Sequence, residues 1–265
     1  MAFTLGIAQT GYPTQGDVLV QARHIAQQAA EQGVDLLVFP ENFMCPHELT
    51  ATELRQIAEP TDGHFANGIC ELAQQHNLWI VSTMSEINPT GGPPFNTAVV
   101  TAPDGTRRGT YRKCHLYDAH GTRESDRMTA GGEPSQPVDT PFCTLGLGIC
   151  YDLRFPEFAR CLALAGCDLI VFPAAWHDGP NKALHWQTLL RARAIENECY
   201  VAGACHGANH CVGKGHVFDP LGNVLASGSD VLLVCQIDPA MVRTARDAMP
   251  IFRHRKPELY GQLIR

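Results

Sequence analysis

The sequence predicts an α/β fold built from two sheets that pack on each other and are covered on their outer faces by helices. Runs typical of strands alternate with runs typical of helices along the whole chain, and hairpins occur beside parallel crossovers. The 265 residues are 45% hydrophobic, which is enough to bury a large core. Since no repeat, linker or low-complexity tract interrupts the chain, we expect one domain over residues 1–265.

The first half of the chain opens an α/β sheet and then adds a hairpin. Apolar runs mark the strands, and apolar residues spaced three and four apart mark the helices. Asp104-Gly105 is a dipeptide typical of tight turns, so the two strands beside it form the hairpin. In chain order we expect a strand at 3–9, a helix from about 17 to 32, a strand at 35–39, a helix at 64–77, and strands at 78–84, 96–101 and 108–111.

The second half continues the alternation and ends in a tail. We expect a strand at 145–149, a helix at 155–165, a strand at 169–172, a helix at 182–197, and strands at 200–204, 216–219, 224–227 and 231–237. Residues 250–265 resemble neither a helix nor a core strand. Their apolar side chains, Phe252, Leu259, Tyr260 and Leu263, are too many to remain in water, so we expect this C-terminal tail to pack at the subunit interface of a homodimer.

The composition excludes several classes of partner. A net charge of −7 and a pI near 5.9 disfavour binding to nucleic acid or to an anionic membrane. No apolar run approaches the roughly 20 residues that cross a bilayer. The eleven cysteines are scattered, and no signal segment precedes Phe3, so we expect free thiols and a cytoplasmic location.

Three reactive side chains stand at the ends of predicted strands. Glu41 follows the run 36–40, Lys113 follows the second hairpin strand, and Cys150 lies between strand 145–149 and the next helix. A helix N-terminus favours a thiolate and can hold an oxyanion. A thiol, a carboxylate and an ammonium provide the nucleophile, general base and electrostatic stabiliser of acyl transfer. Any one of them alone is commonly a core thiol or a solvated charge.

Three blocks of the sequence resemble, in order and spacing, the signature blocks of the nitrilase superfamily of carbon–nitrogen hydrolases. These are Phe39-Pro40-Glu41-Asn42, Tyr111-Arg112-Lys113-Cys114-His115-Leu116 and Gly148-Ile149-Cys150-Tyr151-Asp152-Leu153-Arg154-Phe155-Pro156-Glu157. The resemblance implies a four-layer αββα sandwich, an assembly of two or more subunits, and a catalytic triad of Glu41, Lys113 and Cys150. It also implies a second glutamate after the lysine block, which Glu124 matches. No metal or organic cofactor is implied.

The implied reaction is hydrolysis of a linear amide through a thioester on Cys150. Glu41 would act as the base, and Lys113 with the backbone N–H of Tyr151 would hold the oxyanion. The triplet Cys150-Tyr151-Asp152 resembles the omega-amidase and deaminated glutathione amidase branch. Substrates of that branch are small amides with a free carboxylate, for which Arg154 is a candidate partner. A structural ion pair is the equal alternative for Arg154. Trp176 and His177 match positions that line the pocket.

Two alternatives stay open at the level of sequence. One is an N-carbamoyl amide or carbamoyl polyamine hydrolase, which would release carbon dioxide together with ammonia. The other is a metal-binding or thiol-sensing protein, because the segment from Cys205 to Cys211 with nearby His216 contains soft ligands for zinc. The spacing of that segment matches no common zinc finger.

Overall fold

The first sheet of the computed structural model has six strands. The structure describes residues 1–12, 18–45, 49–207 and 210–260. The strands are β1 (Phe3–Ala8), β2 (Leu36–Val38), β3 (Trp79–Glu86), β4 (Phe95–Thr101), β5 (Arg107–Arg112) and β14 (Leu232–Ile237), in the spatial order β14-β1-β2-β3-β4-β5. Strands β1, β2 and β3 are parallel, and β4 and β5 form the expected hairpin. Gly105, in its turn, has a φ of 78° that favours glycine.

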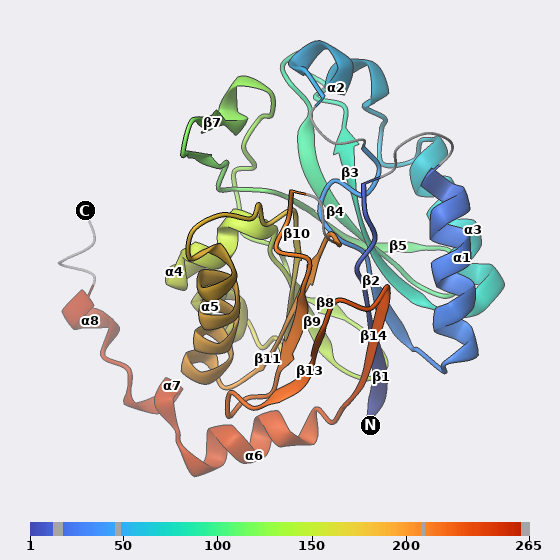
Figure 1. Cartoon of the computed structure of the whole chain (residues 1–265). Helices are drawn as coiled ribbons and strands as arrows, with labels where there is room; N and C mark the ends of the chain where they lie inside the picture. The colour runs from blue at the N-terminus through green and yellow to red at the C-terminus, as the bar shows by residue number, and fades with distance from the viewer. Residues whose placement is uncertain (13–17, 46–48, 208–209, 261–265) are drawn as a thin grey trace.

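The second sheet also has six strands, and it packs against the first (Figure 1). They are β8 (Val138–Asp139), β9 (Thr144–Leu147), β10 (Leu169–Ala174), β11 (Tyr200–Cys205), β12 (Gly215–Phe218) and β13 (Val224–Gly228), in the order β13-β12-β11-β10-β9-β8. Strands β9, β10 and β11 are parallel. A separate small ribbon pairs β6 (Asp118–Ala119) with β7 (Thr122–Arg123).

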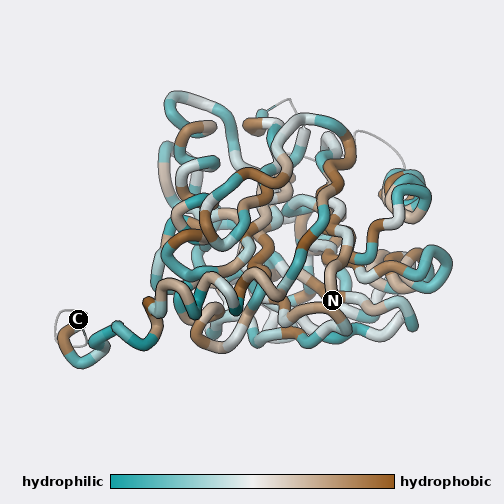
Figure 2. Tube along the Cα trace, turned by 90° about the horizontal axis from the view of Figure 1, so that it is seen from below, coloured by the Kyte–Doolittle hydropathy of each residue, from teal (hydrophilic) through white to brown (hydrophobic). Residues whose placement is uncertain are grey.

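Four helices cover the outer faces of the two sheets. Helices α1 (Val18–Glu31) and α3 (His64–His76) lie on the first sheet, and α4 (Pro156–Leu164) and α5 (Lys182–Asn197) lie on the second (Figure 1). One apolar cluster fills the space between the sheets and continues to α4 and α5, and a second lies between the first sheet and α1 and α3. The tube in Figure 2 shows brown, hydrophobic segments concentrated in this interior. The predicted four-layer αββα sandwich is therefore what the structure has.

Other helices were missed by the sequence prediction. Helix α2 (Ala51–Ile57) begins with a capping box in which Thr50 and Glu53 bond each other's backbone N–H groups. Helix α6 (Ala240–Ala248) follows β14. The expectation of a tail unlike any helix is wrong in part, because 251–254 and 257–260 form the short helices α7 (Ile251–His254) and α8 (Pro257–Tyr260). Pro257 opens α8, and proline is well suited to the first helical position.

The tail leaves the main body, as both Figure 1 and Figure 2 show. Leu259 and Tyr260 are 56% and 50% exposed, whereas the Phe252 ring lies beside the guanidinium groups of Arg160 and Arg246. Leu263 lies outside the described residues. One domain over 1–265, with the tail at an interface, stays a prediction. No helix among the described residues is long and apolar enough to cross a membrane.

Candidate active site

Cys150 occupies a strained turn directly after β9. It begins the 3₁₀ helix η2 (Cys150–Arg154) and has a φ of 46°, a left-handed conformation that is unfavourable for a residue with a side chain. Two residues earlier, Gly148 packs closely against the Phe172 ring. A Cβ at this position would lie 2.4 Å from the ring, so only glycine fits here. The Gly148 N–H also donates to the Val171 carbonyl at 3.0 Å. Such strain is typical of a functional side chain.

Glu41 reaches the same point from the first sheet. The strand β2 ends at Val38, and Pro40 keeps the chain extended before Glu41. The side chain is buried and accepts three hydrogen bonds: from Asn96 Nδ2 at 2.8 Å, from Lys113 Nζ at 2.8 Å and from the Ala175 N–H at 2.7 Å. It also interacts electrostatically with the Cys150 side chain. The carboxylate is thus fixed beside the thiol.

Lys113 follows β5 and is one of the largest fully buried side chains of the protein. Its backbone is held on both sides, because its N–H donates to Asn96 O at 2.9 Å and its carbonyl accepts from the Gly131 N–H at 2.8 Å. Its Nζ lies 2.8 Å from Glu41 Oε1, and 3.0 and 2.9 Å from the two Glu124 oxygens. One buried cation therefore joins two carboxylates.

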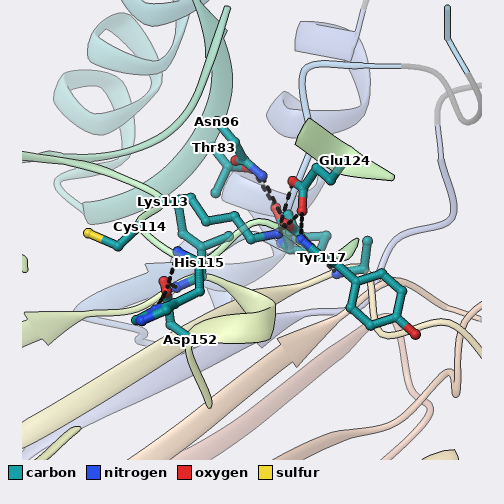
Figure 3. A network of polar contacts seen from close by, with 12 residues as sticks. Thr83, Asn96, Lys113, Cys114, His115, Tyr117, Glu124 and Asp152 are labelled. Atoms are coloured by element: carbon teal, nitrogen blue, oxygen red, sulfur yellow. Dashed lines mark hydrogen bonds and ion pairs between the residues drawn. The ribbon is translucent and has the colours of Figure 1, made fainter. Parts of the chain in front are cut away.

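Glu124 lies in the loop after β7, at the start of the short 3₁₀ helix η1 (Glu124–Asp126). It is buried, and the backbone N–H of Tyr117 donates to its Oε2 at 2.7 Å. Figure 3 shows Lys113, Glu124 and Tyr117 converging in this network. Among the described residues Glu124 forms no hydrogen bond with Cys150, and its side chain bonds Lys113 instead.

The charges of the triad are set by burial and by one another. Burial alone would raise the pKa of Glu41, but the Lys113 ammonium and the hydrogen bonds from Lys113 and Ala175 together outweigh it, and the pKa lies below its ordinary value. Burial would lower the pKa of Lys113, but Glu124 and Glu41 hold it well above its ordinary value. Burial and the Glu41 carboxylate raise the pKa of Cys150 despite Lys113. The resting site thus contains a thiol beside an ionised base, which differs from the thiolate expected from a helix N-terminus.

A second polar network ties the lysine block to the nucleophile turn. The buried Asp152 carboxylate accepts the Tyr111 hydroxyl at 2.7 Å and the Ile149 N–H at 2.8 Å. Its other oxygen lies 2.7 Å from His115 Nδ1, as Figure 3 shows. Because Ile149 directly precedes Cys150, Asp152 helps to fix the position of the nucleophile.

All the site residues predicted from the sequence line a single pocket, whose empty space of about 910 Å³ is partly open to solvent. They are Glu41, Lys113, Glu124, Cys150, Tyr151, Arg154, Trp176 and His177. Tyr151 packs edge-on against Tyr117 at a centroid distance of 5.0 Å, and the Arg154 guanidinium lies 4.6 Å from the centre of the Trp176 ring. Arg154 forms no ion pair among the described residues, so the structure does not support the alternative role of Arg154 as a structural ion-pair partner.

The sequence model described as carbon-nitrogen hydrolase matches residues 4–247, which is most of the chain. The chain belongs to the carbon–nitrogen hydrolase family. This confirms the predicted family.

Related proteins agree with that assignment. This carbon–nitrogen hydrolase is 34% identical to a deaminated glutathione amidase of Escherichia coli O157:H7, over 86% of this chain and 87% of that protein. It is 33% identical to a human omega-amidase, over 93% of this chain and 92% of that protein. The nitrilase and fragile histidine triad fusion protein NitFhit of Caenorhabditis elegans is 37% identical over 90% of this chain. The chain spans only 57% of the length of that fusion protein.

The crystal structure of NitFhit shows the same fold. It superposes with a TM-score of 0.88 at 35% identity, covering 98% of this chain and 66% of that chain. The sandwich predicted for this carbon–nitrogen hydrolase is therefore confirmed by a solved structure as well as by its own strand order.

The segment considered as a zinc site is built differently in this carbon–nitrogen hydrolase. The two ring nitrogens of His206 face the backbone carbonyls of Thr10 and Glu41. No group of three or more potential ligands suited to a metal ion occurs among the described residues, which omit 208–209. All eleven cysteines are free thiols. His206 thus supports the backbone of the base.

Several functional residues had no local signal in the sequence. Asn96 holds Glu41, but a polar residue near the start of a strand is common. Arg127 and Lys182 line the pocket from segments that are distant in the sequence. Asp152 is close to the nucleophile in the sequence, but its partners Tyr111 and His115 are distant in the sequence and can be identified only from the structure.

Proposed function

We propose that this carbon–nitrogen hydrolase is a thiol-dependent amidase that cleaves a small, carboxylate-bearing linear amide through a thioester on Cys150, releasing ammonia or an amine. The observation that carries this proposal is the position of the Glu41 carboxylate, which is hydrogen-bonded to Lys113 Nζ at 2.8 Å and lines the same pocket as the Cys150 thiol. An ionised base against a neutral thiol is the arrangement that nucleophilic attack requires.

In the first half-reaction the Cys150 sulfur attacks the amide carbon while its proton passes to Glu41. The carbonyl electron pair moves onto oxygen and forms an oxyanion. One Lys113 N–H can serve both Glu124 oxygens and a second serves Glu41, which leaves a third for the oxyanion. The Tyr151 N–H lies in the first turn of η2, where helical N–H groups have no helical partner, and acts as the second donor.

The oxyanion then collapses and the carbon–nitrogen bond breaks. Glu41 gives its proton to the departing nitrogen, and the acyl group remains on Cys150 as a thioester. In the second half-reaction Glu41 takes a proton from water, whose oxygen attacks the thioester carbon. The carbon–sulfur bond breaks, the proton returns from Glu41 to sulfur, and the carboxylic acid leaves. Glu124 holds Lys113 in place throughout.

The substrate carries a free carboxylate that pairs with Arg154. This side chain lines the pocket and has no carboxylate partner among the described residues. A guanidinium binds a carboxylate through two parallel hydrogen bonds. The names of the bacterial and human relatives point to deaminated glutathione and to omega-amides as the classes to test. Among omega-amides we propose those of α-keto dicarboxylates.

The proposal includes a homodimer in the cytoplasm. Leu164, Leu184 and Ile195 on α4 and α5 are 48%, 61% and 46% exposed, which is apolar surface that a second copy would cover. Eleven free thiols are typical of a reducing compartment.

The test is an ammonia-release and amine-release screen with 2-oxoglutaramate, 2-oxosuccinamate, deaminated glutathione, simple amides, N-carbamoyl compounds and nitriles. We expect turnover of the carboxylate-bearing amides, complete loss in Cys150→Ala and full activity in Cys161→Ala, whose cysteine is exposed on α4. Carbon dioxide released with the ammonia would favour an N-carbamoyl hydrolase. About one zinc per chain without any turnover would favour the metal-binding alternative.

A further inference from the structure

The apolar side chains that line the pocket gather in one place. All of them except Cys150 and Ala175 belong to one small apolar cluster, which is separate from the core between the two sheets that contains Cys150. We call these pocket-lining members of the small cluster the apolar wall: Cys45, Leu49, Leu54 and Met128. The remaining lining residues are polar, charged or aromatic. The pocket thus has an apolar wall of its own beside its charged groups, and such a wall binds an apolar part of a ligand.

The apolar wall joins two segments of the chain. One segment leads from the base into α2 and the other follows η1, at the end of the sandwich where Figure 1 shows both α2 and β7. The Met128 N–H donates to the Glu124 carbonyl at 2.9 Å, and Arg127 Nη1 donates to the Leu49 carbonyl at 3.1 Å. These hydrogen bonds fix one segment to the turn of Glu124 and to the other segment. The apolar wall is therefore a preformed part of the pocket.

The apolar wall excludes most water. Leu54 and Met128 are each only 6% exposed, and Cys45 is 2% exposed. The Cys45 sulfur lies 3.2 Å from the Ser85 hydroxyl, so the polar atom of this side chain already has a partner. A polar group that reached the wall would lose its own water without gaining a hydrogen bond from these side chains, whereas an aliphatic group would gain from leaving water.

The apolar wall lies on the side of the base. Glu41 is followed by a tight turn in which the Cys45 N–H donates to the Asn42 carbonyl at 2.9 Å, so the wall begins four residues after the base. The acyl carbon is bonded to Cys150 during the reaction, and its chain extends toward Arg154 at the other end of η2. The amide nitrogen must approach Glu41, which returns the proton to it. A substituent on that nitrogen is therefore directed to the apolar wall.

We propose that the apolar wall is a subsite for an aliphatic group carried on the amide nitrogen of the substrate. The proposal rests on the proposed function and names the class of leaving amine that this site favours, an aliphatic one. The thioester route is unchanged, and the aliphatic amine leaves with the proton from Glu41 in the place of ammonia. Because each methylene that leaves water contributes separately, the preference should grow with the length of the chain.

The test measures amine release from a series of amides of 2-oxoglutarate. The nitrogen carries a methyl, ethyl, propyl or butyl group, and a 3-hydroxypropyl group serves as the polar match in length for butyl. We expect kcat/KM to rise roughly 2-fold to 4-fold with each methylene, up to the value for a fully buried methylene. We also expect butyl to be favoured over 3-hydroxypropyl, because the hydroxyl must give up its water at the wall.

Variants of the apolar wall test which residues set this preference. Leu54→Asn with Met128→Gln should flatten the dependence on chain length, and Leu54→Met with Met128→Leu should keep most of it. The ratio of kcat/KM for two amides on one enzyme sample does not depend on the fraction that is folded, so a poorly folded variant still gives a valid ratio. Leu221→Asn is the matched control, because this leucine is 61% exposed outside the pocket, and its chain-length dependence should equal that of the wild type.

The outcomes separate this proposal from the proposed function. Cleavage of the primary amide without any rise along the alkyl series, or a rise that remains in Leu54→Asn with Met128→Gln, would overturn the subsite and leave the amidase intact. Failure to cleave the primary amide and every alkyl amide would overturn the proposed function, and the subsite with it. Calorimetric titration of Cys150→Ala with the same alkyl series should show the same rise in affinity without turnover, and equal affinities would contradict the subsite.

Discussion

Replacing Lys113 with methionine should destabilise the protein strongly, and more at neutral pH than in acid. The side chain is 2% exposed, and its ammonium makes three hydrogen bonds to two carboxylates that are themselves buried. Methionine keeps most of the length and apolar volume. The loss therefore measures the effect of leaving buried carboxylates without a cation, for which we expect about 3–5 kcal/mol at pH 7.

The dependence on pH follows from the pKa of Glu41. In the wild-type protein Lys113 lowers this pKa, so ionised Glu41 contributes stability above the pKa of the unfolded chain, and the contribution is lost as pH falls through the folded pKa. Without Lys113, burial raises the folded pKa above the unfolded one. The variant then loses stability as pH rises through that raised pKa. The difference between wild type and variant must therefore be larger at pH 7 than at pH 5.

Urea unfolding at the two pH values measures this difference. The matched control is Arg108→Met, which breaks an ion pair whose partners are 50% and 52% exposed and should therefore change the stability little. Adding Glu124→Gln to Lys113→Met removes one unpaired carboxylate and should recover part of the loss. A Lys113→Met destabilisation that equals the control, or that does not change between pH 5 and pH 7, would refute the reasoning.

Three further predictions concern the site and the tail. Asp152→Asn should lower the free energy of unfolding by about 1–3 kcal/mol, because one carboxylate oxygen accepts from Tyr111 and Ile149 and the other from the His115 N–H, so the new amide group faces a donor in either orientation. The variant should also have a lower kcat, and an unaltered kcat would contradict the role of Asp152 in placing the nucleophile. The kcat/KM for an amide should stay flat down to about pH 5, since the pKa of Glu41 lies below its ordinary value of about 4.3, and a fall centred near pH 6 or 7 would contradict this. Truncation after Pro250 should weaken dimerisation and lower activity together in sedimentation and rate assays, whereas a fully active truncated dimer would count against the interfacial tail.

The three triad residues could be predicted because each lies within three residues of the end of a strand. An apolar run that stops before Glu41 or Cys150, and a hairpin strand that stops at Lys113, each indicate an end of the sheet, where side chains from different strands meet. The three sequence blocks that resemble the nitrilase superfamily then indicated that these strand ends lie together in one site. Topology could be anticipated for the same reason, since strands separated by amphipathic helices pair in parallel.

What could not be predicted depends on contacts between distant segments. Asn96 and the Ala175 N–H reach Glu41 across the fold, and nothing in their local sequence marks them. The raised pKa of Cys150 depends on its burial and on the Glu41 charge, both of which follow from the fold and neither of which a helix start indicates. Helix α2 is a different case, because Thr50 and Glu53 have the spacing of a capping box and the signal was present in the sequence.

The central claim is that Glu41 is the base that lets Cys150 form a thioester. Rapid mixing with the cleaved amide, acid quenching and mass measurement of the intact protein test it directly. The account predicts an acyl adduct on the wild-type protein that is absent from Cys150→Ala and from Glu41→Gln, and an adduct that persists longer in Glu124→Gln. An adduct that accumulates equally in Glu41→Gln, or that remains in Cys150→Ala, would contradict it.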